Sequence, residues 1–232
     1  MKIGYGVFGV AYEKMLKNDL HNINSIDYKL IKNMILLDNN STEFLYSQAC
    51  SYDVKNHELY HFAQKFKALN DKETIQNLLE YTKNIVDSYN IDFINMQFGG
   101  TEKEILDRGT DWCSDMARIG AVLLQCLGIP CRIVYLANLN KAYNGHVVNE
   151  AYYEDQYGVV DFIYGYQFYD NKPISALDIY NNHTLLDDYP KDYKELYSAI
   201  AISEYNPCDI NNNYLISTPN NYYLKLINTN HQ

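Results

Sequence analysis

The most constraining stretch of this chain is a helical pattern that ends sharply and leads directly into a series of strands. Apolar residues recur at three- and four-residue steps from Met116 to Leu127, which is typical of a helix that buries one face. Gly128 suits the left-handed position after a helix, and Pro130 prevents the helix from continuing. We therefore expect a helix that begins at Cys113 and ends near Leu127.

Three segments after this helix have the composition of strands. Segments 131–136, 146–153 and 159–164 are rich in β-branched and aromatic residues. The loop 137–144 and the turn 154–158 that separate them are short, and short connections favour antiparallel neighbours. The middle of the chain therefore predicts an α+β fold in which the helix packs on an antiparallel sheet.

Helices are also expected before this core. The clearest pattern covers 71–89, with Asp71 as its candidate N-cap. Weaker patterns predict helical structure at 28–37, 57–69 and 191–202, loops at 90–110 and 165–190, and short strands at 214–217 and 222–227. We expect one domain over residues 1–232, with a core at about 71–164, a helical N-terminal extension at 1–70 and a C-terminal covering segment at 165–232.

Composition excludes several classes of function. Of the 232 residues, 47% are hydrophobic, which is too many for a disordered chain. The net charge of −10 argues against binding to nucleic acid or to an anionic membrane. No stretch is long enough to span a bilayer, so we expect a cytoplasmic protein. Five scattered cysteines suggest reduced thiols rather than a disulfide framework.

Cys113, His146 and Asp161 are the candidate reactive residues. A thiolate is the reactive form of cysteine, and both a helix N-terminus and a neighbouring imidazolium lower the pKa of a thiol. His146 begins a predicted strand, and Asp161 lies in the next strand, which is too apolar for an unpartnered carboxylate. The gap between them fits adjacent antiparallel strands, so we expect Asp161 to fix the imidazole of His146.

The other cysteines fit structural roles better. Cys126 lies late in the helix beside Leu127, and Cys50, Cys131 and Cys208 carry no reactive pattern. A zinc site formed by Cys113, Cys126, Cys131 and His146 would lack the paired short spacings of structural zinc sites. We expect neither a metal nor another cofactor.

Three ordered blocks resemble the transglutaminase-like superfamily, a papain-related group of cysteine enzymes, in its bacterial branch. They are Arg108-Gly with Cys113-x-Asp-x-Ala, Leu127-Gly-Ile-Pro-Cys-Arg-Ile-Val, and Gly145-His-x-x-Asn-Glu followed by Val160-Asp. This resemblance covers residues 71–164 and implies a papain-like core. It also implies that Cys113 is the nucleophile, His146 the general base and acid, and Asp161 the orienting carboxylate.

The surroundings of the expected triad are less well defined. The backbone N–H of Cys113 is one candidate donor to an oxyanion, and Gln97 and Trp112 are candidates for a second. That branch usually has Trp where this chain has Val148, and Pro-Thr where this chain has Phe162-Ile163. We therefore expect Val148 to belong to an altered substrate wall.

The expected activity is amide or peptide hydrolysis or acyl transfer, through a thioester on Cys113. The partner would be a protein, a peptide or a small amide. Two alternatives remain open: a catalytically silent domain that binds proteins or peptides, and a specialised enzyme that transfers acyl groups between small molecules. The identity of the substrate, the choice between water and an amine, and the oligomeric state are not predicted.

Overall fold

A six-stranded antiparallel sheet forms the centre of the molecule in a computed structural model that describes residues 35–36, 49–88, 100–138, 145–207. Its strand order is β1-β6-β2-β3-β4-β5. The strands are β1 (Ile35–Leu36), β2 (Cys131–Ala137), β3 (Gly145–Tyr153), β4 (Gln156–Asp161), β5 (Tyr166–Gln167) and β6 (Ala199–Glu204). Every neighbouring pair is antiparallel, so the predicted α+β fold is confirmed.

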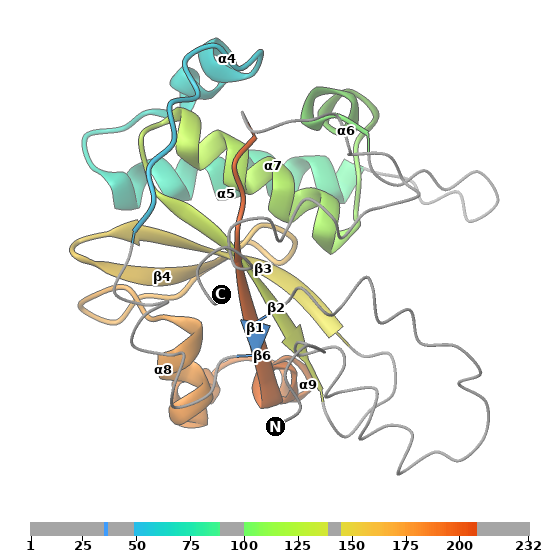
Figure 1. Ribbon diagram of the computed structural model, residues 1–232. Helices are drawn as coiled ribbons and strands as arrows, with labels where there is room; N and C mark the ends of the chain where they lie inside the picture. The colour runs from blue at the N-terminus through green and yellow to red at the C-terminus, as the bar shows by residue number, and fades with distance from the viewer. Residues whose placement is uncertain (1–34, 37–48, 89–99, 139–144, 208–232) are drawn as a thin grey trace, which may run out of the picture.

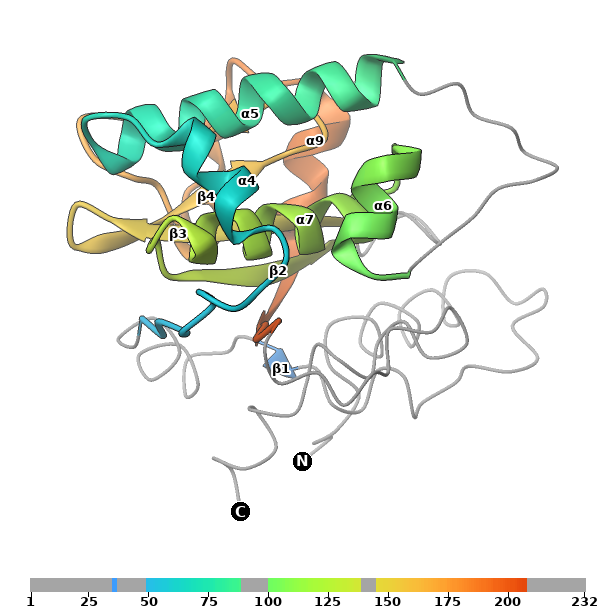
Figure 2. The ribbon, with the colours of Figure 1, turned by 90° about the horizontal axis from the view of Figure 1, so that it is seen from above.

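Helices cover both faces of this sheet. The α-helices are α4 (Tyr60–Ala63), α5 (Asp71–Ser88), α6 (Glu102–Arg108), α7 (Cys113–Cys126), α8 (Ala176–Asn181) and α9 (Lys191–Glu195), and the 3-10 helices are η1 (Gln64–Phe66), η2 (His183–Leu186) and η3 (Leu196–Ser198). Figure 1 shows α4 to α7 above the sheet and α8 and α9 below it, and Figure 2 shows α5 and α7 running side by side. Each face has its own apolar core. No helix among the described residues is both long and apolar enough to cross a membrane.

Helix α7 has the position that the sequence predicts. Ile119, Leu123 and Leu124 are fully buried in the upper core, and Gly128 has a φ of +84°, which ends the helix in the left-handed region. Gly120 lies where the helix approaches the sheet most closely. A Cβ at this position would lie 2.2 Å from the Phe162 ring, so only glycine permits this packing.

The largest difference from the sequence prediction is at the C-terminal side. Segment 191–202 was expected to be helical, but it is helical only to η3 and then forms β6, which lies between β1 and β2. Ile200 and Ile202 alternate toward the lower core, which is the spacing of a strand. This segment is therefore not only a covering layer, because it supplies a strand inside the sheet.

Other boundaries also differ. The expected loop 90–110 contains α6, the expected helix 57–69 is reduced to α4 and η1, and the expected helix 28–37 has strand β1 at its end. Segment 165–190 contains β5, α8 and η2. The N-cap of α5 is Asn70 rather than the expected Asp71. The Asn70 Oδ1 accepts the backbone N–H of Glu73 at 2.8 Å. The strands expected at 214–217 and 222–227 lie outside the described residues.

Candidate active site

Cys113 is the first residue of α7 and is half-buried at the surface of the molecule. The preceding residue, Trp112, does not cap the helix with its side chain. N–H groups in a first helical turn have no partner inside the helix, and the helix dipole is positive there. The position of Cys113 at this helix end therefore favours negative charge on an oxyanion bound nearby.

The sheet holds this helix in place through a polar contact. Asn149 of β3 donates its Nδ2 to the carbonyl of Ala117 at 2.9 Å, and this amide is completely buried. His146 lies on the same strand, three residues before Asn149. Because β3 carries both residues, the contact fixes the start of α7 relative to the histidine.

His146 and Asp161 form a buried pair at the ends of β3 and β4. The His146 Nε2 and Asp161 Oδ2 atoms are 2.8 Å apart. His146 is only 6% exposed, and Asp161 is fully buried. The Cys113 side chain lies close enough to His146 to raise the pKa of the imidazole. The structure therefore brings the three sequence-predicted residues together in the order Cys113, His146, Asp161.

The Asp161 carboxylate makes further hydrogen bonds that fix its orientation. Its Oδ1 accepts the backbone N–H groups of Ile163 at 2.9 Å and Tyr164 at 3.1 Å. Its Oδ2 accepts the hydroxyl of Tyr193 at 2.7 Å. The contacts at Oδ1 turn the backbone, which explains why β4 ends at Asp161 although a strand was expected to continue to residue 164.

Tyr193 is the member of this site that sequence reasoning missed. It comes from α9 on the lower face of the sheet and is 5% exposed. Its hydroxyl and the His146 ring bind the same carboxylate oxygen. Tyr193 lies in the segment 191–202 that was expected to be helical, and no local motif indicated that its hydroxyl would meet Asp161.

The electrostatics of the site favour an imidazolium. Burial alone would lower the pKa of His146, but the contacts with Asp161 and Cys113 outweigh it and raise this pKa to about 10. Burial would raise the pKa of Asp161, but His146 and Tyr193 hold it below its ordinary value. Burial raises the pKa of Tyr193 well above its usual range, so its hydroxyl stays a hydrogen-bond donor.

The remaining sequence candidates have different positions. Trp112 is 43% exposed next to Cys113. Val148 is 1% exposed and packs in the lower core, so the expectation that it belongs to a substrate wall is wrong. Tyr164 is the exposed side chain beside the histidine, at 52% exposure and with its ring centroid 5.4 Å from that of His146. Gln97 lies outside the described residues.

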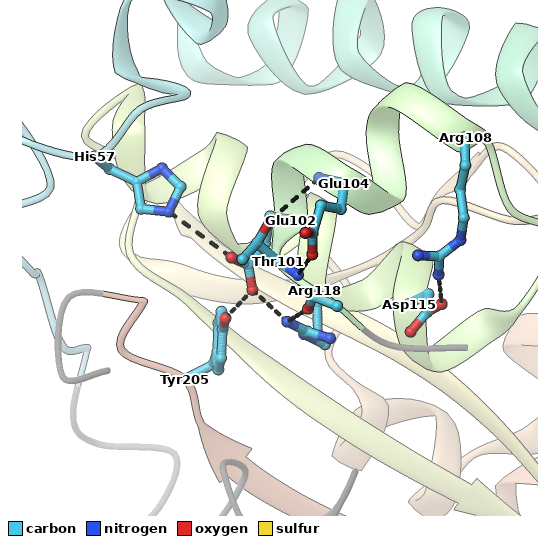
Figure 3. A network of polar contacts seen from close by, with 9 residues as sticks. His57, Thr101, Glu102, Glu104, Arg108, Asp115, Arg118 and Tyr205 are labelled. Carbon is cyan, nitrogen blue, oxygen red and sulfur yellow. Dashed lines mark hydrogen bonds and ion pairs between the residues drawn. The ribbon is translucent and has the colours of Figure 1, made fainter. Parts of the chain in front are cut away.

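A second buried polar network joins α7 to α6 and to Tyr205 (Figure 3). Arg118 of α7 donates to Glu102 of α6 at 2.8 Å, and both side chains are buried. The Tyr205 hydroxyl also donates to Glu102, and His57 Nε2 lies 3.8 Å from its second oxygen. Burial would raise the pKa of Glu102, but His57, Arg118 and Tyr205 lower it to about 2.

Two further contacts fix α6 against the start of α7. Thr101 and Glu104 form a capping box at the N-terminus of α6. At its other end, Arg108 donates to Asp115 at 2.7 Å, within the first turn of α7. These contacts are also drawn in Figure 3, and together they restrict the position of the turn that carries Cys113.

The described residues contain no group of three or more His, Cys, Asp or Glu side chains that could hold a metal ion. Cys126 and Cys131 are both buried in the upper core. Burial raises the pKa of Cys131 to about 12, which opposes ionisation of its thiol. These two cysteines therefore have the environment of packed side chains.

Comparison with known proteins identifies a family. Residues 60–162 match the model of the transglutaminase-like superfamily. No curated protein matches the chain. A candidate cysteine protease from Cytophaga hutchinsonii is similar in structure at 19% identity and a TM-score of 0.38, over 64% of this chain and 47% of its own. A TGase structure is similar at 18% identity and a TM-score of 0.37, over 77% of this chain and 44% of its own.

This chain thus spans less than half the length of either solved structure. The family match itself covers α4 to β4 and the residue after it, including Cys113, His146 and Asp161. Tyr193 and β6 lie beyond the matched residues. The chain therefore contains a domain of the transglutaminase-like superfamily, which occupies residues 60–162.

Proposed function

We propose that this protein is a cysteine enzyme that transfers acyl groups through a thioester on Cys113, as a hydrolase of amides or peptides or as an acyltransferase. The observation that carries this proposal is the 2.8 Å bond between His146 Nε2 and Asp161, together with the Cys113 side chain near enough to raise the pKa of His146. A thiol next to a histidine that is oriented by a carboxylate is the arrangement that nucleophilic catalysis requires.

In the first half of the reaction, the Cys113 thiolate attacks the carbonyl carbon of the substrate. The negative charge moves to the carbonyl oxygen, which the Cys113 N–H at the start of α7 is placed to stabilise. The C–N bond then breaks, and His146 gives its proton to the departing amine. Because Nε2 is bound to Asp161, the Nδ1 atom is the ring nitrogen left for this transfer.

In the second half, water or a second amine attacks the thioester carbonyl. His146 takes a proton from the attacking group, and the Cys113 thiolate leaves. Water yields a free carboxylate, and an amine yields a new amide. Asp161 and Tyr193 act by positioning, since they hold the ring of His146 and do not touch the substrate.

Alkylation of individual cysteines tests the proposal before any substrate is known. Iodoacetamide labelling would be followed by mass spectrometry at a series of pH values, in the native protein and in His146→Ala. Cys50 is the matched control, because it is half-buried as Cys113 is. We expect Cys113 to react faster than Cys50 at pH values below the ordinary thiol range of about 8.5, and to lose this advantage in His146→Ala.

Equal rates at Cys113 and Cys50 would overturn the proposal and favour the silent binding domain. A library of peptides and small amides would then identify the substrate. Turnover of peptides that disappears in Cys113→Ala supports the peptide reaction, whereas turnover of small amides alone supports the small-molecule alternative.

A further inference from the structure

A groove with a volume of about 560 Å³ lies between α5 and the segment 165–169 that contains β5. Five α5 side chains line it: Leu79 and, at helical spacings that place them on one face, Lys72, Gln76, Glu80 and Lys83. Gly165, Gln167 and Tyr169 form the opposite wall. The groove is separate from both buried polar networks.

The cations in this groove are available to a ligand. Lys72 Nζ lies 3.5 Å from the centroid of the Tyr169 ring, and neither Lys72 nor Lys83 forms an ion pair with any residue that the structure describes. By contrast, Lys103 and Lys194 are paired with Asp107 and Asp187. On a chain with a net charge of −10, two lysines that line one groove and form no ion pair with a described residue make a local site for negative charge.

Gln167 supplies a buried acceptor at the same place. Its Nε2 donates to the Tyr153 hydroxyl at 3.0 Å, which fixes the orientation of the amide. Its Oε1 is buried and has no hydrogen-bond partner among the described residues. A buried acceptor without a donor destabilises the molecule. A ligand that brings an N–H group to Gln167 would relieve this destabilisation.

One end of the groove adjoins the candidate active site. The Gly165 N–H donates to the Asp161 carbonyl at 2.9 Å, and Lys83 lies beside Gly165. The intervening residue, Tyr164, contacts the His146 ring. A substrate held at Cys113 could therefore continue past Tyr164 into the groove at Lys83 and run along α5 toward Lys72.

The spacing of the lysines defines the length of such a segment. They are 11 positions apart on α5, or about 16 Å at a rise of ~1.5 Å per residue. An extended peptide covers this distance with about five residues at ~3.3 Å each. Glu80 lies between the lysines, so it disfavours a carboxylate in the middle of the segment and favours a donor there.

We propose that the α5–β5 groove binds the acidic flank of a peptide or protein substrate, with one carboxylate at Lys83, a second at Lys72 and a backbone N–H at Gln167. This proposal rests on the proposed function, because it describes how a substrate of that site is chosen. It adds a substrate class, peptides or proteins with an acidic segment, which the reactive residues alone do not define.

Binding in the absence of chemistry tests the groove by itself. The probe is a fluorescein-labelled peptide with two glutamates about five positions apart, and the protein is the full chain carrying Cys113→Ala, so that no thioester forms. Fluorescence anisotropy would give the Kd at low and high salt. We expect Lys83→Glu and Lys72→Glu each to weaken binding about five- to tenfold, with a smaller effect at high salt.

Lys191→Glu is the control, because it makes the same change in charge at an exposed lysine on the opposite face of the sheet. Its Kd should stay within about twofold of the parent value. Gln167→Leu should weaken binding about fivefold at every salt concentration, since it removes a neutral acceptor. A peptide in which glutamine replaces both glutamates should lose the salt dependence.

Failure of the groove proposal can be distinguished from failure of the proposed function. If the peptide does not bind, or if Lys83→Glu and Lys191→Glu bind it equally, the groove proposal is overturned whatever Cys113 does. If the groove variants weaken binding while Cys113 labels no faster than Cys50, the groove stands as a peptide site and the enzyme proposal is overturned.

Discussion

Two of the buried ionic clusters among the described residues are similar in burial but different in chemistry. In one, His146 contacts Asp161, and in the other, Arg118 contacts Glu102. The guanidinium of Arg118 is always charged, whereas the imidazole of His146 can gain and lose a proton in the accessible pH range. His146 also contacts a thiol, Cys113, while Glu102 is surrounded by groups that only hold it in place. Burial therefore does not distinguish the pair that is proposed to be reactive from the structural pair. The distinction lies in the type of cation and in the thiol that lies next to His146.

The largest expected effect is on the reactive cluster. Asp161→Asn should lower kcat/KM by about ten-thousandfold, because the amide cannot stabilise the imidazolium or fix its tautomer. The melting temperature should change little in comparison, since the side chains are nearly isosteric. The measurement is turnover of whichever substrate the library identifies, together with thermal unfolding. Unchanged turnover would remove Asp161 from the mechanism.

The reverse result is expected for the structural cluster. Arg118→Met should reduce the free energy of unfolding by about 3–5 kcal/mol, because it leaves the buried Glu102 carboxylate without its guanidinium. Turnover per folded molecule should be retained at low temperature. Urea unfolding and active-site titration would measure the two quantities. Loss of turnover without loss of stability would show that the two clusters do not differ as described.

A smaller effect is expected at Tyr193. Tyr193→Phe removes the hydroxyl that donates to Asp161 and should reduce kcat by about tenfold, which corresponds to one charge-assisted hydrogen bond of ~1.5–3 kcal/mol. Tyr197→Phe is the matched control, because it removes a hydroxyl that is buried in the same core but does not hydrogen-bond the Asp161 carboxylate. If both variants lose the same activity, Tyr193 contributes only packing. A shift of the pH profile in Tyr193→Phe alone is the result that supports a positioning role.

The two clusters should also differ in the pH dependence of stability, where they should respond in opposite directions. The pKa of His146 is raised, so its contribution is complete below the ordinary value of about 6.5 and is lost as pH rises through about 10. The pKa of Glu102 is lowered, so its contribution is present above its ordinary value and is lost as pH falls through about 2. Urea unfolding of His146→Gln and Glu102→Gln across this range measures both differences from the native protein. A His146→Gln difference that grows between pH 7 and 10 would contradict the assignment.

Local periodicity was sufficient to predict the part of the fold that carries the reactive residues. The apolar stripe of α7, its glycine stop and the strands after it depend on neighbours within a few positions, and all are confirmed. The contact between His146 and Asp161 was also predictable, because strands joined by a short turn must lie side by side. The capping box that begins α6 was visible in the sequence as Thr101 and Glu104, but it was read as part of a loop.

The remainder depends on contacts between distant parts of the chain. Tyr193 reaches Asp161 across 32 positions, and β6 pairs with β2 from even further away. Neither contact leaves a periodic signal. The prediction that Val148 belongs to a substrate wall was wrong for a related reason. Val148 shares a strand face with His146, but α8 and α9 cover this face at Val148, two residues further along β3. Only the assembled lower layer determines which of these side chains is accessible.

The position of β6 has a consequence for the order in which the protein is made. A ribosome delivers α7, β2, β3 and β4 first, and these carry Cys113, His146 and Asp161. Their sheet then lacks its partner along β2, and the apolar side chains of Val134, Leu136 and Val148 lack the helices that cover them. Tyr193 and β6 are made later than these elements, and their arrival closes the sheet and secures Asp161 in one event. The reactivity proposed for the thiol would therefore begin only after β6 has been synthesised, well after the three residues themselves.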